Sequence, residues 1–275
     1  MAYRKVDDAS LTAVADSIRE KGGTSGALAF PDGFVSAVQA IQAGGGEADS
    51  SFKDVIERAA VNPTLPSDLT KIGNFAFQGC NNLALTSLPA GITIIGEHAF
   101  YDCSNLALTS LPAGITYISG AAFQGCYNLA LTSLPAGITS IGNNAFYQCS
   151  KLALTSLPAG ITYIRTSMFT SCSSLALTSL PAGIKTIDNY AFQNCSKLAL
   201  TSLPAGITSI GSSAFDSCIG LTSITFEGTP GSISSNAFRK CSNLTTINVP
   251  WAEGAVSNAP WGATNATINY NYTGE

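Results

Sequence analysis

The ten residues LALTSLPAGI (residues 83–92) occur six times in this chain without a change of letter. The copies begin at Leu83, Leu106, Leu129, Leu152, Leu175 and Leu198, so the step between them is always 23 residues. All eight cysteines keep this step, from Cys80 to Cys241, and a phenylalanine precedes each of them by three residues. A fixed period of about 20–50 residues is typical of repeat proteins. The period of 23 residues therefore predicts a solenoid in which each repeat forms one coil.

One repeat, CNNLALTSLPAGITIIGEHAFYD (residues 80–102), predicts three short segments. Residues 83–88 are apolar and stop at Pro89, which favours a strand end. Residues 92–95 predict a second extended piece, and Ala99 and Phe100 predict a short helical or 3₁₀ turn. One repeat is too small to bury its own apolar side chains, so stacked repeats must bury them against one another.

The pattern L-x-x-L-P-x-x-I-T-x-I-x-x-x-A-F-x-x-C resembles the BspA-type leucine-rich repeat. The resemblance covers about residues 65–264, and the A-F-x-x-C signature recurs seven times, with one variant, MFTSC, at Met168. We therefore predict a right-handed leucine-rich-repeat solenoid of about nine 23-residue coils, preceded by a small α-helical N-terminal unit. The resemblance implies a protein that binds other molecules and does not catalyse reactions.

The two ends of the chain depart from the repeat. Residues 1–46 predict two short amphipathic helices, and residues 47–64 predict a linker and a helix that caps the solenoid. Residues 265–275 predict a C-terminal capping strand, in which Ile268, Tyr270 and Tyr272 alternate with polar residues. The N-terminal unit is interpreted either as an attachment module or as a folding cap or dimerisation helix pair.

Residues 11–41 and 247–272 resemble the terminal segments of tail-associated proteins from phages and prophages of Gram-positive gut bacteria. The resemblance implies that the N-terminal helices bind other tail or virion proteins and that the solenoid binds a host cell-surface glycan or protein. We expect no apolar signal segment at MAYRKVDDAS, synthesis in the bacterial cytoplasm, and a location in the virion tail. The alternatives are a BspA-like bacterial surface adhesin and a structural spacer rod without a ligand.

Composition argues against several other classes of function. Charged residues make up 11% of the chain, whereas about 25% is typical. The net charge is −4, and no dense basic stripe is present, so we expect no nucleic-acid partner. No run of 18 apolar residues exists, so we expect no membrane insertion.

The cysteines predict a ladder of buried thiols without disulfides. Neighbouring Cβ atoms in stacked strands would lie about 5 Å apart, which is too far for a disulfide. A zinc site needs converging ligands at short spacings such as C-x₂-C, and the chain has one histidine, His98. We therefore predict no metal, no cofactor and no enzymatic activity.

Differences between the copies indicate where a ligand could bind. We define the strand column as the residues that occupy one variable position of the repeat, namely Ile94, Tyr117, Ser140, Tyr163, Thr186 and Ser209. The turn column occupies another and comprises Tyr101, Gln124, Tyr147, Thr170, Gln193 and Asp216. Tyrosine among small polar residues suits recognition, so the strand column with Tyr101 and Tyr147 is the candidate ligand-binding set. Variation without function in surface loops is the alternative.

The third position of the fixed motif leaves one question open. The inner coils read Leu-x-Leu-x-x-Leu, whereas the last coils read Leu221-x-x-Ile224-x-Phe226. If both share one register, an exposed apolar stripe results that would mark a partner or homo-oligomer surface, formed by Leu85, Leu108, Leu131, Leu154, Leu177 and Leu200. A bulge that buries these leucines is the alternative, and it is the one we favour.

Overall fold

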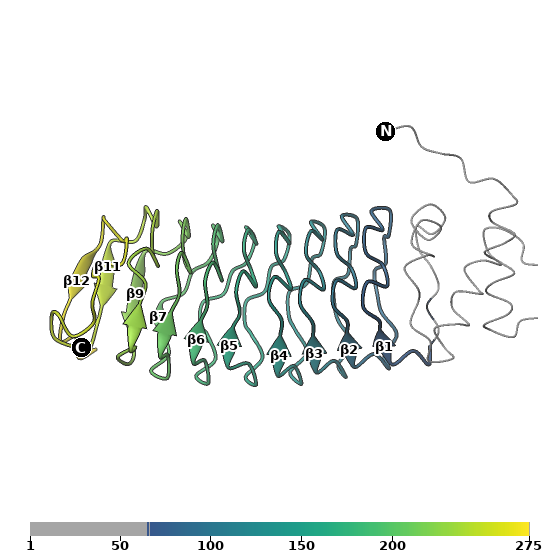
Figure 1. The fold of residues 1–275 in the computed structure, drawn as a ribbon, viewed down its shortest axis with the longest axis horizontal. Coiled ribbons are helices and arrows are strands. Elements are labelled where there is room, and N and C mark those ends of the chain that lie inside the picture. Colours follow the sequence, from purple (N-terminus) through teal and green to yellow (C-terminus); the bar gives the residue numbers. More distant parts are fainter. Residues whose placement is uncertain (1–64, 66, 275) are drawn as a thin grey trace, which may run out of the picture.

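The computed structural model describes residue 65 and residues 67–274, which form one row of stacked coils (Figure 1). The row contains about nine turns of 23 residues, as the sequence period predicts. The predictions for the helical unit at residues 1–46 and for the capping helix at residues 47–64 lie outside the described residues.

A two-residue strand recurs in each coil where the sequence predicts the second extended piece. These strands are β1 (Lys71–Ile72), β2 (Ile94–Ile95), β3 (Tyr117–Ile118), β4 (Ser140–Ile141), β5 (Tyr163–Ile164), β6 (Thr186–Ile187), β8 (Ser209–Ile210) and β10 (Ser232–Ile233). They pair in parallel with a register of one whole repeat, as in Ile94↔Tyr117. The second residue of each strand is a buried isoleucine, and the first faces outward. The alternation follows from the two-residue period of a strand.

The strand predicted at residues 83–88 does not form in the inner coils, so this prediction is wrong there. Between residues 106–111 and the previous copy the only backbone bond runs from the Ala107 N–H to the Leu85 carbonyl oxygen, at 3.2 Å. One bond per step does not make a ladder. Ladders appear only towards the C-terminus, in the sheet of β7 (Ser202–Leu203), β9 (Ser223–Phe226), β11 (Thr246–Asn248) and β12 (Thr267–Asn269).

The third leucine position points into the core. Leu83 and Leu85 are both buried, and Thr86 is exposed. Leu85 is 7% exposed, and its counterparts in the other copies are at most 1% exposed, namely Leu108, Leu131, Leu154, Leu177 and Leu200. The hypothesis of an exposed leucine stripe is therefore wrong. The inner coils and the last coils therefore do not share one register.

The remaining side of each coil contains the Ala-Phe turn. Local bonds such as Tyr101 N–H to the His98 carbonyl close three-residue turns in place of a helix. Alternate amides bond to the next coil, as Phe100 N–H does to the Ala122 carbonyl at 2.8 Å. Two positions per coil adopt positive φ, for example His98 (52°) and Asp102 (56°). Gly, Asn, Asp and Ser are common at the second position, where glycine and short polar residues tolerate the left-handed region, whereas the first also holds Phe75, Ala121 and Tyr190.

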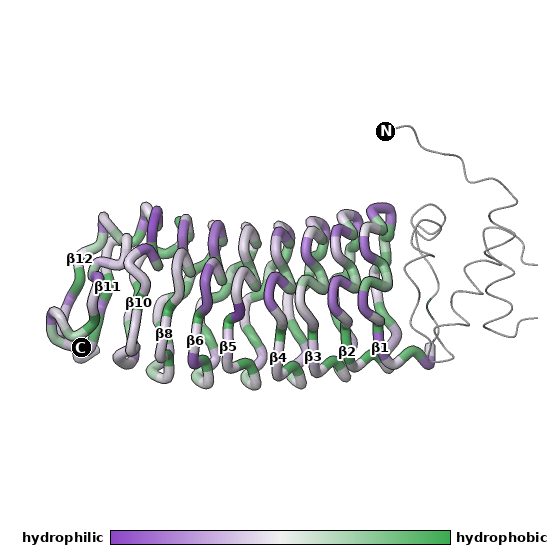
Figure 2. Tube along the Cα trace, in the orientation of Figure 1, coloured by the Kyte–Doolittle hydropathy of each residue, from purple (hydrophilic) through white to green (hydrophobic). Residues whose placement is uncertain are grey.

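Two ladders of side chains fill the core. The eight phenylalanines from Phe77 to Phe238 stack in sequence, with ring centroids 4.9–5.7 Å apart and nearly parallel planes. All eight cysteines are buried free thiols, as predicted. Sγ–H of Cys103 donates to the Phe77 carbonyl at 2.9 Å, and later coils repeat this bond. Figure 2 shows the same hydropathy pattern recurring in successive coils.

The thiols of the native protein should therefore react very slowly with thiol reagents, because every thiol is buried in the cysteine ladder. Dithionitrobenzoate at pH 8 should label fewer than about one thiol per chain within minutes, and all eight after denaturation in guanidinium. Rapid labelling of several thiols in the native protein would contradict the ladder.

The C-terminal end of the solenoid is closed by aromatic side chains. Trp261 takes the place of the repeating phenylalanine and is fully buried. Its ring and that of Trp251 lie 6.1 Å and 5.2 Å from the ring of Phe226. Residues 265–275, which were predicted to form a capping strand, contain β12, and Tyr270 packs against the core beside it.

Candidate ligand-binding face

The strand column forms a line of side chains in two parts, of which the large members are exposed. Strand pairing places Ile94, Tyr117 and Ser140 side by side in β2, β3 and β4. The pairing of β5, β6 and β8 does the same for Tyr163, Thr186 and Ser209. Ile94, Tyr117 and Tyr163 are 40–43% exposed, which is high for large side chains with apolar surface. The predicted alignment of the column is confirmed within each sheet, Ser140, Thr186 and Ser209 are half-buried, and the role of the column in binding stays a prediction.

The turn column is a less regular surface. Tyr101 and Tyr147 are half-buried, whereas Thr170 and Asp216 are buried. Thr170 and Asp216 therefore cannot belong to an exposed line, whereas the role of the half-buried Tyr101 and Tyr147 in binding stays a prediction. The position lies directly after the core phenylalanine, so its side chain is partly covered by the neighbouring coils.

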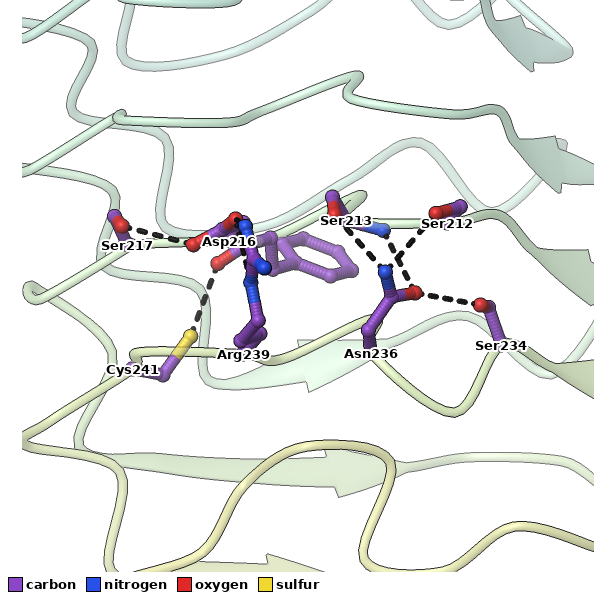
Figure 3. Close-up of polar contacts among 9 residues, drawn as sticks. Ser212, Ser213, Asp216, Ser217, Ser234, Asn236, Arg239 and Cys241 are labelled. Carbon is purple, nitrogen blue, oxygen red and sulfur yellow. Dashed lines mark hydrogen bonds and ion pairs between the residues drawn. The ribbon is translucent and has the colours of Figure 1, made fainter.

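The buried Asp216 belongs to a polar network near the C-terminal end (Figure 3). Arg239, one coil further on, donates from Nε to Oδ2 of Asp216 at 3.0 Å, and the Ser217 hydroxyl donates to Oδ1 at 2.8 Å. Asn236 bridges Ser212, Ser213 and Ser234 in the same region. Each labelled residue has a hydrogen-bond partner, and the bonds from Arg239 to Asp216 and from Asn236 to Ser212 and Ser213 join neighbouring coils, so we interpret the network as structural.

His98 lies in the turn and stacks on a neighbouring ring. Its ring lies 5.1 Å from that of Phe75 and 5.3 Å from that of Tyr101. Nδ1 is buried and has no hydrogen-bond partner; the nearest acid oxygen, Oε1 of Glu97, is 3.9 Å away. In the described part of the chain, no group of three or more His, Cys, Asp or Glu side chains could hold a metal ion.

The sheet along the strand column is interrupted once. Strands β1 to β4 form one sheet and β5, β6, β8 and β10 form another, with no ladder between β4 and β5. Arg165 follows β5 at a position that holds Gly96, Gly142 and Gly211 in other coils. A Cβ atom at Gly96 would lie 2.6 Å from backbone of the preceding coil, and one at Gly142 would lie 2.4 Å from it. Ser119, Asp188 and Ser234 carry a Cβ atom at this position in coils that remain paired, so a Cβ atom alone does not break the pairing; Arg165 differs from them in carrying the longest side chain there.

A hollow of about 470 Å³ lies beside this interruption. Its floor is Gly120 and Ala121, its sides include Tyr117 and Gln124, and Asn143 and Asn144 come from the next coil. Glu97 and His98 border it in one direction and Arg165 in the other. We call this feature the Gly120 hollow. The predicted ligand-binding set contains Tyr117 and Ser140, which line it. Sequence analysis missed the other lining residues, namely Gly120, Ala121, Gln124, Asn143, Asn144 and Arg165.

The comparisons with known proteins agree with this architecture. The family model of the BspA type leucine rich repeat region matches residues 49–176 and 167–258, which together make up more than half of the chain. The coils thus define a leucine-rich-repeat protein. The chain belongs to the BspA-type leucine-rich repeat family. No curated protein sequence matches it.

Several solved structures of bacterial leucine-rich-repeat proteins are similar. One from Bacteroides ovatus is 25% identical with a TM-score of 0.55, over 76% of this chain and 60% of that one. A leucine-rich cell surface protein from Faecalibacterium prausnitzii is 26% identical with a TM-score of 0.52, over 66% and 59% of the two chains. The T. pallidum leucine-rich repeat protein is 31% identical with a TM-score of 0.50, over 58% and 78%. The chain thus spans about three fifths of the first two proteins.

No helix among the described residues has the length and apolar character to cross a membrane.

Proposed function

We propose that this chain is a non-enzymatic recognition protein whose solenoid binds a molecule on a cell surface. The exposed strand column supports the proposal most directly. Its tyrosines and isoleucine follow closely after a ten-residue motif that is repeated letter for letter. Large aromatic side chains that are ordered before binding lose little conformational entropy when a ligand covers them.

The finer proposal is that the protein belongs to a phage or prophage tail and binds the host. It is supported by the resemblance of residues 11–41 and 247–272 to segments of tail-associated proteins. Under this proposal the ligand is a host surface glycan or protein, and the N-terminal region binds other virion proteins. Mass spectrometry of purified virions tests the location: the chain should be present in stoichiometric amounts with other tail proteins.

A surface adhesin is the second candidate function. It is favoured by the similarity to the leucine-rich cell surface protein of Faecalibacterium prausnitzii. An adhesin should appear on intact producing cells when they are labelled with antibody, whereas a tail protein should appear on virions. A spacer rod, the third class, would bind cells in neither setting.

Replacing Tyr117 and Tyr163 by alanine should weaken binding to host cells at least about tenfold, which corresponds to about 1.4 kcal/mol. The reason is the loss of two aromatic contact surfaces that are 40% and 43% exposed. Flow cytometry of fluorescently labelled protein on bacterial cells measures the effect.

Tyr127→Ala is the matched control, because Tyr127 is 46% exposed but lies outside the strand column. Its binding should equal that of the unchanged protein. Equal binding by the Tyr117→Ala/Tyr163→Ala protein would reject the strand column as the recognition surface.

A further inference from the structure

The Gly120 hollow exists because one coil carries small residues where its neighbours do not. Gly120 occupies the position of Glu97 in the coil before and Asn143 in the coil after. Ala121 likewise replaces His98 and Asn144. A repeat protein with equal side chains at these positions would have a continuous ridge here. The two small residues instead leave a depression flanked by larger polar side chains.

The amide side chains around the hollow are unused. Among the described residues, no hydrogen bond is made by the side chains of Asn143, Asn144 or Gln124. The asparagines that match Asn143 in other coils are used: Oδ1 of Asn74 accepts from Glu97 N–H, and Oδ1 of Asn189 accepts from Ser212 N–H.

Arg165 explains this difference. Each of those bonds passes beside a glycine, Gly96 or Gly211, whose Cβ would lie 2.6–2.7 Å from the asparagine oxygen. Arg165 stands at that glycine position in the coil after Asn143 and carries a Cβ atom. The amide of Asn143 therefore cannot occupy the equivalent place. It remains available at the edge of the hollow to a ligand.

The guanidinium of Arg165 packs on an aromatic ring and has no charged partner among the described residues. Its central carbon lies 4.9 Å from the ring centroid of Tyr163, a distance at which the cation is attracted to the ring face. Within residues 67–274 it forms no ion pair and its side chain donates no hydrogen bond. An arginine fork of this kind matches the oxygens of a carboxylate or a phosphate.

Charge is distributed unequally along the hollow. Glu97 borders it at one end and Arg165 at the other, three coils away, which is roughly 14 Å at a strand spacing of about 4.8 Å. Between them lie the Tyr117 ring and the three amides. A ligand of one or two sugar rings fits this length. The volume of about 470 Å³ also lies in the range of small-molecule sites.

We infer that the Gly120 hollow binds an acidic saccharide, with its oxyanion on Arg165 and a sugar ring against Tyr117. Asn143, Asn144 and Gln124 supply both donors and acceptors, which sugar hydroxyls require. The oxyanion is either the carboxylate of a uronic acid or the phosphate of a sugar phosphate. This inference rests on the proposed recognition function and specifies its ligand.

Calorimetric titration of the full chain with three probes tests the ligand class. Digalacturonic acid presents a carboxylate, galactose 1-phosphate presents a phosphate, and galactobiose is neutral. At least one acidic probe should bind about tenfold or more tightly than galactobiose, because only the acidic probes engage Arg165. The stronger of the two acidic probes identifies the source of the oxyanion.

Two variants test the site, each introducing a residue that already occurs at the equivalent position of another repeat. Arg165→Ser copies Ser119 and Ser234 at the same position, and Gly120→Asn copies Asn143. The second is sterically permitted, since a Cβ at Gly120 meets only the Asn143 carbonyl oxygen at 3.5 Å. Each should weaken binding of the acidic probe about tenfold or more. Lys185→Thr removes an exposed cation elsewhere and should leave the affinity unchanged.

Three outcomes would overturn the inference: no binding of either acidic probe, equal binding of galactobiose, or unchanged affinity in Arg165→Ser. Circular dichroism of each variant establishes that the fold is intact before binding is compared. If Tyr117→Ala/Tyr163→Ala still loses cell binding while no acidic probe binds, the recognition function stands and the acidic ligand is rejected.

Discussion

Raising the pH above 9 should unfold the solenoid within about one to two pH units. Burial raises the pKa of seven thiols, from Cys103 to Cys241, above the ordinary value of 9.0. For Cys241, which is less buried than most of them, the pKa rises to about 12. The thiols therefore stay protonated in the folded chain at a pH where the unfolded chain releases their protons.

The sign of the effect follows from this difference. Stability is fully present below pH 9 and is lost as the pH rises from 9 through the folded-state pKa values. Each thiol lowers the free energy of unfolding by about 1 kcal/mol between pH 9 and pH 10, and by about 1.4 kcal/mol per pH unit above that. Seven thiols together lower it by roughly 7 kcal/mol over the first pH unit, which is comparable with the whole stability of a typical domain.

Circular dichroism between pH 7 and 11, with a reductant present, measures this transition. Removing one thiol in Cys149→Ala should reduce the loss of unfolding free energy between pH 9 and pH 10 by about 1 kcal/mol. The loss is read from urea titrations at pH 9.0, 9.5 and 10.0. A protein that stays folded at pH 11, or a loss that Cys149→Ala leaves unchanged, would rule out the thiols as the cause.

Phe146→Ala should destabilise the protein by about 3–5 kcal/mol. The ring of Phe146 is fully buried between those of Phe123 and Phe169, whose centroids lie 5.5 Å and 5.7 Å away. Alanine leaves a cavity, because the coils on both sides are held at a fixed spacing by backbone hydrogen bonds and cannot collapse into it.

Urea unfolding at pH 7 measures the loss, with Tyr127→Ala as the exposed-aromatic control. The control should change the free energy of unfolding by less than about 0.5 kcal/mol. Because each coil contacts only its neighbours, the cavity should also divide the cooperative unit and broaden the transition. A loss below about 1 kcal/mol would show that the phenylalanine stack contributes little.

The sequence period was sufficient to predict the coils, their core ladders and the exposed strand column. Phe100 and Cys103 recur in each repeat at the same 23-residue step, and one repeat is too small to bury them. Stacking of the repeats is then the only way to bury these side chains, so the core could be predicted without knowledge of the local backbone geometry. The strand column, which includes Tyr117, followed from comparing the variable positions of the repeats, and the structure adds the alternation along Tyr117–Ile118.

Burial of Leu85 was the favoured alternative and is confirmed, but the sequence did not exclude an exposed position, because two registers fit the same letters. The Gly120 hollow was missed for a different reason. Its signal was present in the columns, as Gly120 among Glu97 and Asn143, and as Arg165 among glycines. Its meaning becomes clear only from the hydrogen bond that Glu97 N–H donates to Oδ1 of Asn74. That bond shows that a glycine in the next coil leaves room for the asparagine side chain. Such a bond cannot be deduced from the letters alone.

The unvarying step of 23 residues has a consequence for how the protein can change its length. Insertion or loss of one whole repeat realigns every phenylalanine and cysteine with a copy of itself, so the core reforms without a mismatch. Each such event alters the rod by one strand spacing, about 4.8 Å. The Gly120 hollow depends only on residues 97–165. Insertions or deletions in the other coils would therefore move the binding site nearer to or farther from either end of the rod while preserving its chemistry.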